Sequence, residues 1–178
     1  ATCCSWPAVW RGRPRLSWGN GVVISWEMRF LIALLMLMAP ALAQPRTTTT
    51  LVSEVAAVAP GQPFRVALDQ IFARGWHSYW RNPGAAGAAM EVAWEGGDAG
   101  PLQFPAPTRI PSGPLISFGY ENSATYLATI TPPPGLRPGQ SLALTADARW
   151  LVCADICIPE EGRFTLSLPV EAVARRDP

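Results

Sequence analysis

Cys153 and Cys157 are the residues of this chain whose type and spacing point most directly to chemistry. They have three residues between them in the run RWLVCADICIPEE, which lies between two apolar stretches. On one straight strand, residues four positions apart lie roughly 13 Å from each other, whereas a disulfide needs Cα atoms about 4.4 to 6.8 Å apart. We therefore expect the backbone to reverse at Ala154, Asp155 and Ile156, which would place the two cysteines at the tip of a tight hairpin.

A cysteine pair at such a tip is compatible with three kinds of site. A structural disulfide would close a loop of only about five residues and would add little stability, because the gain grows with loop length. A small exposed ring is more typical of exchangeable disulfides, and two thiolates can also bind a soft metal ion. Asp155, Glu160 and Glu161 disfavour a nearby thiolate, which suits a pair that waits for a more reactive cysteine of another protein.

The N-terminal part of the chain has the pattern of an export signal. Met28 and Arg29 precede the apolar run Phe30–Met38, and the small-residue motif Ala41-Leu42-Ala43 follows. This order predicts a cleavable signal peptide at residues 28–43, with an apolar run too short to cross a bilayer. Residues 1–27 have no periodicity, and we interpret them as an upstream, non-native and disordered segment.

Composition narrows the possible partners of the exported part. The chain of 178 residues is 15% charged and 49% hydrophobic, with 14 basic and 13 acidic residues. Without residues 1–43 the net charge is about −2, and the absence of clustered positive charge argues against nucleic acid as a partner. Cys153 and Cys157 are then the remaining cysteines, and a lone pair in an oxidising compartment normally forms a disulfide.

Alternation of apolar and polar residues at period two predicts strands on both sides of the cysteine pair and through the rest of the chain. Closely spaced prolines after Gly100 leave no room for a helix of normal length. The expected fold is all-β: a single immunoglobulin-like antiparallel β-sandwich over residues 51–172. Residues 44–50 are expected to be a flexible lead-in, and residues 173–178 a tail or the start of a linker. The predicted strands are 51–59, 64–69, 90–95, 115–118, 124–131, 141–152 and 162–170.

Beyond the cysteine motif, the chain resembles a known family. The runs WLVCADICIPEEGRF, GWHSYWRNPG, FPAPTRIP and FGYENSATYLATI are similar to the N-terminal periplasmic domain of the DsbD thiol:disulfide interchange proteins, and particularly to the branch typified by the copper-tolerance protein ScsB. The similarity covers most of Val58–Val170. It implies a periplasmic immunoglobulin-like domain that needs no cofactor and forms part of a protein-disulfide reductase, without being a complete enzyme by itself.

The resemblance also implies partners and roles. Cys153 and Cys157 would receive electrons from a membrane-embedded domain, in the same protein or a separate one, and pass them to periplasmic thioredoxin-fold proteins such as disulfide isomerases and cytochrome c maturation factors. Cys157 would form the mixed disulfide, by analogy with the second cysteine of the family. The family shields its pair with an aromatic residue on a cap loop, and the FGYEN segment makes Phe118 or Tyr120 the candidate cap. Further candidates for the partner surface are Trp76, Tyr79, Trp80 and Asp155.

Two other functions stay open at this point. A periplasmic copper-binding module would use both thiolates and His77, the single histidine of the chain. C-x-x-x-C followed by proline resembles the copper site of the Sco proteins, although that family has a thioredoxin fold with helices. An adhesion or assembly sandwich with an incidental disulfide would instead keep the pair oxidised.

Overall fold

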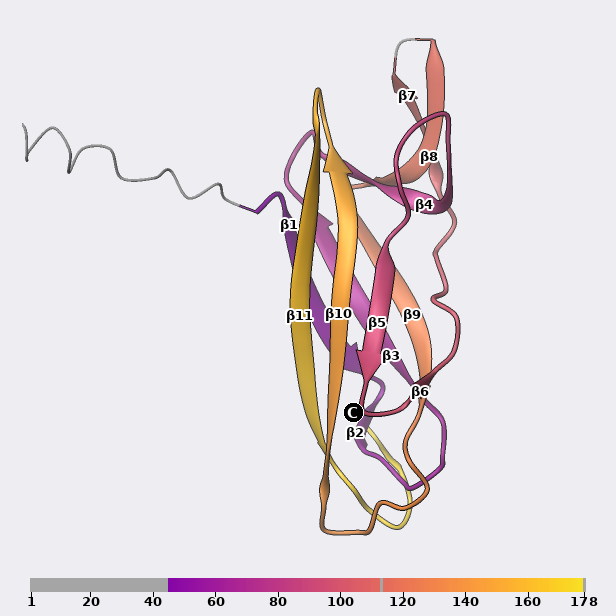
Figure 1. The fold of residues 1–178 in the computed structure, drawn as a ribbon, viewed down its shortest axis with the longest axis vertical. Helices are drawn as coiled ribbons and strands as arrows, with labels where there is room; N and C mark the ends of the chain where they lie inside the picture. The colour runs from indigo at the N-terminus through magenta and orange to yellow at the C-terminus, as the bar shows by residue number, and fades with distance from the viewer. Residues whose placement is uncertain (1–44, 113, 178) are drawn as a thin grey trace, which may run out of the picture. The chain divides into compact units, whose positions relative to one another are not determined.

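A computed structural model describes residues 45–112 and 114–177, which form β-strands joined by turns and loops (Figure 1). The predicted segments 1–27 and 28–43 lie outside the described residues. Within the described part, no helix is long and apolar enough to span a membrane. The strands are β1 (Thr47–Ser53), β2 (Val55–Ala57), β3 (Phe64–Phe72), β4 (His77–Gly84), β5 (Glu91–Glu95), β6 (Asp98–Ala99), β7 (Thr108–Ser112), β8 (Leu115–Glu121), β9 (Ser123–Thr131), β10 (Ser141–Cys153), β11 (Cys157–Pro169) and β12 (Arg175–Arg176).

Two antiparallel sheets form the two layers of a sandwich. The four-stranded sheet has the order β1-β3-β9-β6, and the larger sheet has the order β11-β10-β4-β8-β7, with β5 also paired to β10. A small third sheet pairs β12 with β2. β5 runs beside the middle of β10, while β4 meets β10 at Cys153, so the end of β10 has a different neighbour from its middle.

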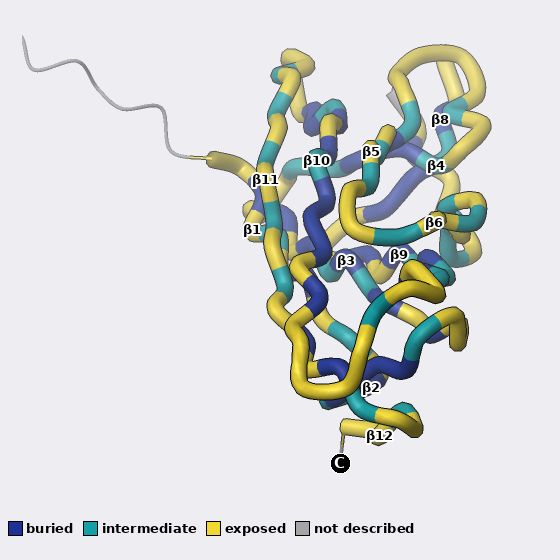
Figure 2. The backbone as a smooth tube through the Cα atoms, turned by 60° about the horizontal axis from the view of Figure 1, so that its bottom comes forward, coloured by how far each residue is buried: buried dark blue, intermediate teal, exposed yellow. Residues whose placement is uncertain are grey.

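The core lies between the two layers. Figure 2 shows buried stretches along β10 and along the β3 and β9 layer, whereas the connections are mostly exposed. Period-two alternation accounts for this pattern, because successive side chains of a strand point to opposite faces. The predicted strand faces are therefore confirmed for β3 and β10. Their buried apolar residues are Phe64, Val66 and Leu68 in β3 and Leu142, Leu144, Ala146, Ala148 and Trp150 in β10.

Regular structure begins at Thr47 rather than near Leu51, so much of the expected lead-in is part of β1. The Thr47 side chain is buried, and its hydroxyl oxygen accepts a hydrogen bond of 3.1 Å from the indole N–H of Trp150. A buried hydroxyl is tolerated where it has such a partner. The polar residues that suggested flexibility therefore help to join β1 to the opposite sheet.

The larger sheet contains residues that are typical of turns. Asn82-Pro83-Gly84 lies inside β4, where the register with β8 shifts between Tyr79 and Gly84. Proline and glycine are tolerated at such an irregularity. β7 contains Pro111 and was not predicted; it lies at the edge of the sheet, where the missing N–H of proline costs no ladder bond.

Candidate disulfide site

The β10–β11 hairpin ends at the cysteine pair. Its two strands have 13 residues each and pair in continuous register as far as Cys153 opposite Cys157. The reversal uses Ala154, Asp155 and Ile156, and the Ala154 N–H donates a hydrogen bond of 3.0 Å to the Ile156 carbonyl. The predicted hairpin tip is confirmed.

Cys153 and Cys157 form a disulfide with their Cα atoms 4.1 Å apart. The two residues differ in their access to solvent: Cys153 is 1% exposed, whereas Cys157 is exposed. An attacking molecule therefore meets Cys157 first.

The disulfide lies in a row of four residues that face one another across the larger sheet. Cys157 of β11 pairs with Cys153 of β10, which pairs with His77 of β4, and His77 pairs with Glu121 of β8. Directly opposed residues of neighbouring strands point to the same face of a sheet. The sheet thus places an imidazole beside the disulfide and a carboxylate beside the imidazole.

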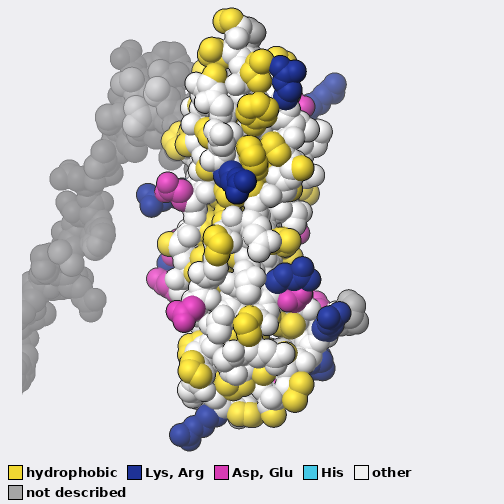
Figure 3. Space-filling model, turned by 90° about the vertical axis from the view of Figure 1, so that its right-hand side faces the viewer, with side chains coloured by type: hydrophobic (Ala, Val, Ile, Leu, Met, Phe, Trp, Pro, Cys, Tyr) yellow, Lys and Arg dark blue, Asp and Glu magenta, His cyan; other side chains and the backbone are white. Residues whose placement is uncertain are grey.

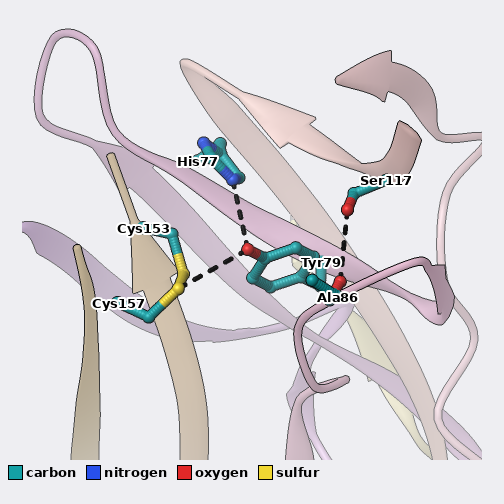
Figure 4. Close-up of a disulfide and its surroundings, with 6 residues drawn as sticks. All are labelled: His77, Tyr79, Ala86, Ser117, Cys153 and Cys157. Atoms are coloured by element: carbon teal, nitrogen blue, oxygen red, sulfur yellow. Dashed lines mark hydrogen bonds between the residues drawn. A yellow bond between two sulfur atoms is a disulfide. The ribbon is translucent and has the colours of Figure 1, made fainter. Parts of the chain in front are cut away.

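Tyr79 is the aromatic residue in contact with the disulfide. Its hydroxyl oxygen lies 3.7 Å from Cys157 Sγ and 3.4 Å from His77 Nε2 (Figure 4). The His77 and Tyr79 rings meet edge to face, with centroids 5.3 Å apart. Because the two residues are two positions apart on β4, they share a face, and Tyr79 is 4% exposed.

Burial changes the proton affinity of both side chains. It lowers the pKa of His77 from its ordinary value of 6.5, although the carboxylate of Glu121 opposes this shift. It raises the pKa of Tyr79 above its ordinary value of 10.0. In both cases the low-polarity surroundings disfavour the charged form. Near neutral pH the site therefore holds a neutral imidazole and a protonated phenol.

A loop of small residues after β4 supports the Tyr79 ring. Gly87 has a φ of 106°, and a Cβ atom on it would lie 2.3 Å from Tyr79 Cε1. The hydroxyl of Ser117 donates a hydrogen bond of 3.2 Å to the Ala86 carbonyl, which ties this loop to β8 (Figure 4). Only a residue without a side chain fits this close to the ring.

The two cap candidates from the sequence lie in strand β8 rather than in a loop. Tyr120 is 5% exposed, its hydroxyl donates a hydrogen bond of 2.8 Å to the Pro105 carbonyl, and its ring packs edge-on against Tyr126. Tyr120 is thus a core residue. Phe118 is half-buried, faces Arg109 across the β7–β8 pair and packs near Gly84. Because they are two positions apart on β8, alternation assigns both to one face, and they differ in burial rather than in face.

The other candidates for the partner surface surround the site less directly. Trp76 and Trp80 are half-buried and pack against the core. The guanidinium of Arg46 lies over the Trp76 ring and that of Arg81 over the Trp80 ring, each 5.1 Å from the ring centroid. Asp155 is exposed in the loop between the cysteines.

The metal-site alternative finds little support in this geometry. His77 lies opposite Cys153, but its Nε2 atom is directed at the Tyr79 hydroxyl. Among the described residues, no group of three or more His, Cys, Asp or Glu side chains is arranged to hold a metal ion. In the disulfide form neither sulfur is a thiolate.

The fold and the site together define a β-sandwich with a disulfide at the exposed end of a hairpin. Residues 47–169 match the sequence model of the family described as "Thiol:disulfide interchange protein DsbD, N-terminal". The chain belongs to this family. A search of curated proteins returned no significant match.

One solved structure supports the same fold. The N-terminal periplasmic domain of ScsB from Proteus mirabilis superposes with a TM-score of 0.54 at 17% sequence identity, over 76% of this chain and 51% of that chain. This chain therefore spans about half of that structure. The reduced N-terminal domain of Neisseria meningitidis DsbD gives a TM-score of 0.43 at 16% identity, over 67% of this chain and 86% of that one. The predicted immunoglobulin-like sandwich is confirmed.

Proposed function

We propose that this chain is a periplasmic thiol-disulfide exchange module that relays electrons through Cys153 and Cys157. The observation that carries the proposal is a disulfide at the exposed tip of a hairpin, in a domain of the DsbD N-terminal family. The electron donor would be a membrane-embedded domain, in the same protein or a separate one. The acceptors would be thioredoxin-fold proteins of the disulfide isomerase or cytochrome c maturation type. Export would use residues 28–43 as signal peptide.

The exposure of the two cysteines supports a division of roles. Reduced Cys157, as a thiolate, attacks one sulfur of the partner's disulfide; that bond breaks, and the second partner sulfur leaves as a thiolate. Cys153 then attacks Cys157 Sγ, which releases the first partner sulfur and restores the Cys153–Cys157 bond. Two electrons pass to the partner, and its two sulfurs take up the two protons that the cysteines lose.

A purely structural disulfide at this position would add little to the stability of the folded protein. The pair closes a loop with a sequence separation of only 4. The chain-entropy relation gives about 2 kcal/mol for a loop of about five residues, against about 3 kcal/mol for one of about 15. The hairpin is also already held by a continuous ladder of strand pairs. A bond that the fold can lose at small cost suits repeated opening and closing.

In this proposal Tyr79, rather than Phe118 or Tyr120 of the FGYEN segment, shields the disulfide. Its hydroxyl contacts Cys157, and the loop around Gly87 packs against its ring. Phe118 packs near Gly84, at the base of that loop, and would support it. Tyr79 would move aside when a partner approaches Cys157.

Exposed apolar residues near the site offer a contact surface for a partner. Ile156 is 64% exposed at the hairpin tip beside Asp155. Leu115 and Ile116, at the start of β8, are also exposed. Figure 3 shows hydrophobic side chains scattered over the right-hand side of the molecule as drawn in Figure 1. Ile156, Asp155 and Tyr79 would contact a docked thioredoxin-fold protein, whereas Trp76 and Trp80 pack against the core and would support this surface from behind.

Trapping of a mixed disulfide tests the proposal. With an oxidised thioredoxin-fold protein as probe, the reduced wild-type domain should become oxidised, and the probe reduced. A Cys153→Ala variant should form a stable mixed disulfide with the oxidised probe, while the matched Cys157→Ala variant should form almost none. No exchange by the wild-type domain would refute the function, and trapping by Cys157→Ala alone would reverse the roles of the two cysteines.

A further inference from the structure

We propose that His77 is a positioning residue for exchange, which accepts the proton of the Cys157 thiol, and returns it, through the hydroxyl of Tyr79. This inference rests on the exchange function proposed above and adds a proton path to it. It concerns a histidine that pairs in the sheet with the buried cysteine but is connected through Tyr79 to the exposed one.

The geometry provides a continuous path of three groups. Tyr79 is the middle group, with its hydroxyl oxygen 3.7 Å from Cys157 Sγ and 3.4 Å from His77 Nε2 (Figure 4). These separations are at the long end for hydrogen bonds, as is common in a resting site, where such bonds tighten only when the reacting partner is present. The edge-to-face packing of the two rings and the close contact at Gly87 keep the hydroxyl in place.

The protonation states suit this path. Burial lowers the pKa of His77, so its Nε2 is free to accept a proton near neutral pH. Burial raises the pKa of Tyr79, so its hydroxyl stays protonated and can donate to one neighbour while it accepts from the other. Tyr79 is therefore a neutral link rather than a base.

The charged groups around the imidazole come from several elements. β8 contributes Glu121, directly opposite His77, and its carboxylate favours the imidazolium form. β10 and β11 contribute the cysteine pair, and the loop between them carries Asp155. β4 itself carries Arg81, whose guanidinium lies over the Trp80 ring. Glu121 would thus favour the imidazolium that forms when Cys157 gives up its proton.

In the proposed step, one proton moves from Cys157 to His77. The Cys157 thiol gives its proton to the Tyr79 oxygen while the Tyr79 O–H proton moves to His77 Nε2, which leaves a thiolate and an imidazolium. The thiolate attacks the partner's disulfide, whose second sulfur leaves with the electron pair and takes a proton from solvent. Once Cys157 is in the disulfide, the buried imidazolium releases its proton to solvent, which restores the neutral imidazole of the disulfide form. When the donor next releases Cys157 as a thiolate, His77 takes a proton from solvent and passes it to Cys157 by the same path.

The pH dependence of Cys157 alkylation tests this path. The reduced full chain is treated with iodoacetamide, and modified Cys157 is measured by peptide mass spectrometry. The wild-type rate should show an inflection below pH 6.5, the ordinary pKa of histidine, in addition to the ordinary rise near the thiol pKa. His77→Gln, which keeps a polar side chain but does not titrate in this range, should lose the inflection, and its rate at pH 7 should fall by about tenfold or more.

Tyr79→Phe should have the same effect as His77→Gln, and the double variant should be no slower than either single variant, because all three break one path. Tyr126→Phe is the matched control: it also removes the hydroxyl of a buried tyrosine, but one outside the path, and should keep the inflection. Glu121→Gln should move the inflection to lower pH, whereas Glu95→Gln, at the exposed ion pair with Arg163, should leave it in place.

An inflection that persists in His77→Gln overturns the proposal, as does a Tyr79→Phe variant that behaves like wild type. If Tyr79→Phe does not fold, His77→Gln decides the question alone, because this position is only half-buried. Alkylation needs no protein partner, so the path can fail while exchange with the thioredoxin-fold probe succeeds. Lack of exchange with the probe would instead refute the function on which the path rests.

Discussion

The two cysteines face each other in the hairpin but have different surroundings. Cys153 is buried where β10 meets β4, and Cys157 is exposed at the start of β11. The two tyrosines near the site differ as well: Tyr120 points into the core, whereas Tyr79 reaches the disulfide. The identity of a side chain therefore says less about its role than the face of the strand that carries it.

At the scale of single residues, His77 should make the stability of the folded protein depend on pH. Burial lowers its pKa in the folded state, so the unfolded chain binds this proton more tightly. The free energy of unfolding should then fall as pH drops from about 7 through 6.5 and on to the lower pKa of the folded protein. Urea unfolding of the oxidised protein at a series of pH values measures this effect.

His77→Gln is the comparison for that experiment, because glutamine does not titrate in this range. The difference in unfolding free energy between wild type and His77→Gln should move against wild type as pH falls. An unchanged difference between pH 7 and pH 5 would mean that burial does not perturb this histidine.

At the scale of elements, the hairpin and the loop after β4 together form the site. The hairpin brings the cysteines together, and the loop packs closely against the ring of Tyr79, which contacts them. Residues 85–89 of the loop are four alanines and Gly87, so this part lies against the ring without large side chains of its own. Two hydrogen bonds join the loop to β8: one from the Ser117 hydroxyl to the Ala86 carbonyl and one of 3.1 Å from the Ala85 N–H to the Ile116 carbonyl.

Gly87→Ala should uncover the disulfide. The added Cβ would lie 2.3 Å from Tyr79 Cε1, at a φ of 106° that disfavours alanine. We expect Tyr79 to shift, a loss of about 1 to 2 kcal/mol in unfolding free energy, and faster reduction of the disulfide by dithiothreitol. Gly135→Ala is the control, since its Cβ would have nothing within 4 Å. Equal reduction rates in the two variants would argue against shielding by Tyr79.

At the scale of the whole molecule, the sandwich provides the rigid support for the site. Core side chains of both sheets fill the space between the layers, and the Trp150 indole N–H joins the larger sheet to Thr47 of β1. The disulfide lies at one end of the long β10–β11 hairpin, and the small β2–β12 sheet lies toward the other (Figure 1). Reduction of the pair can thus occur far from most of the core.

Leu144→Ala should test how the core supports the site. Leu144 is fully buried in β10, so its truncation should cost about 2 to 5 kcal/mol of unfolding free energy, measured in urea. The exposed Leu115→Ala should change stability by no more than about 0.5 kcal/mol. A small loss in Leu144→Ala would show that the β10 core position is not tightly packed.

Much of the fold follows from local patterns. Alternation identified β3, β5, β9 and β10 because each buries one face against the opposite sheet. Thr47, Pro83 and Pro111 misled the prediction, because their side chains suggest loops. A buried hydrogen bond, a register shift and an edge position make strands possible at these residues, and all three depend on the rest of the fold.

The sequence by itself determined the cysteine pair and its hairpin, because the spacing of Cys153 and Cys157 and the period-two strands around them are local properties. Only the tertiary structure decided which side chains surround the disulfide. Period two assigns His77 and Tyr79 to one face of β4, but it does not say that β4 pairs with the end of β10. That pairing joins residues far apart in the chain, and it depends on how the whole sheet packs.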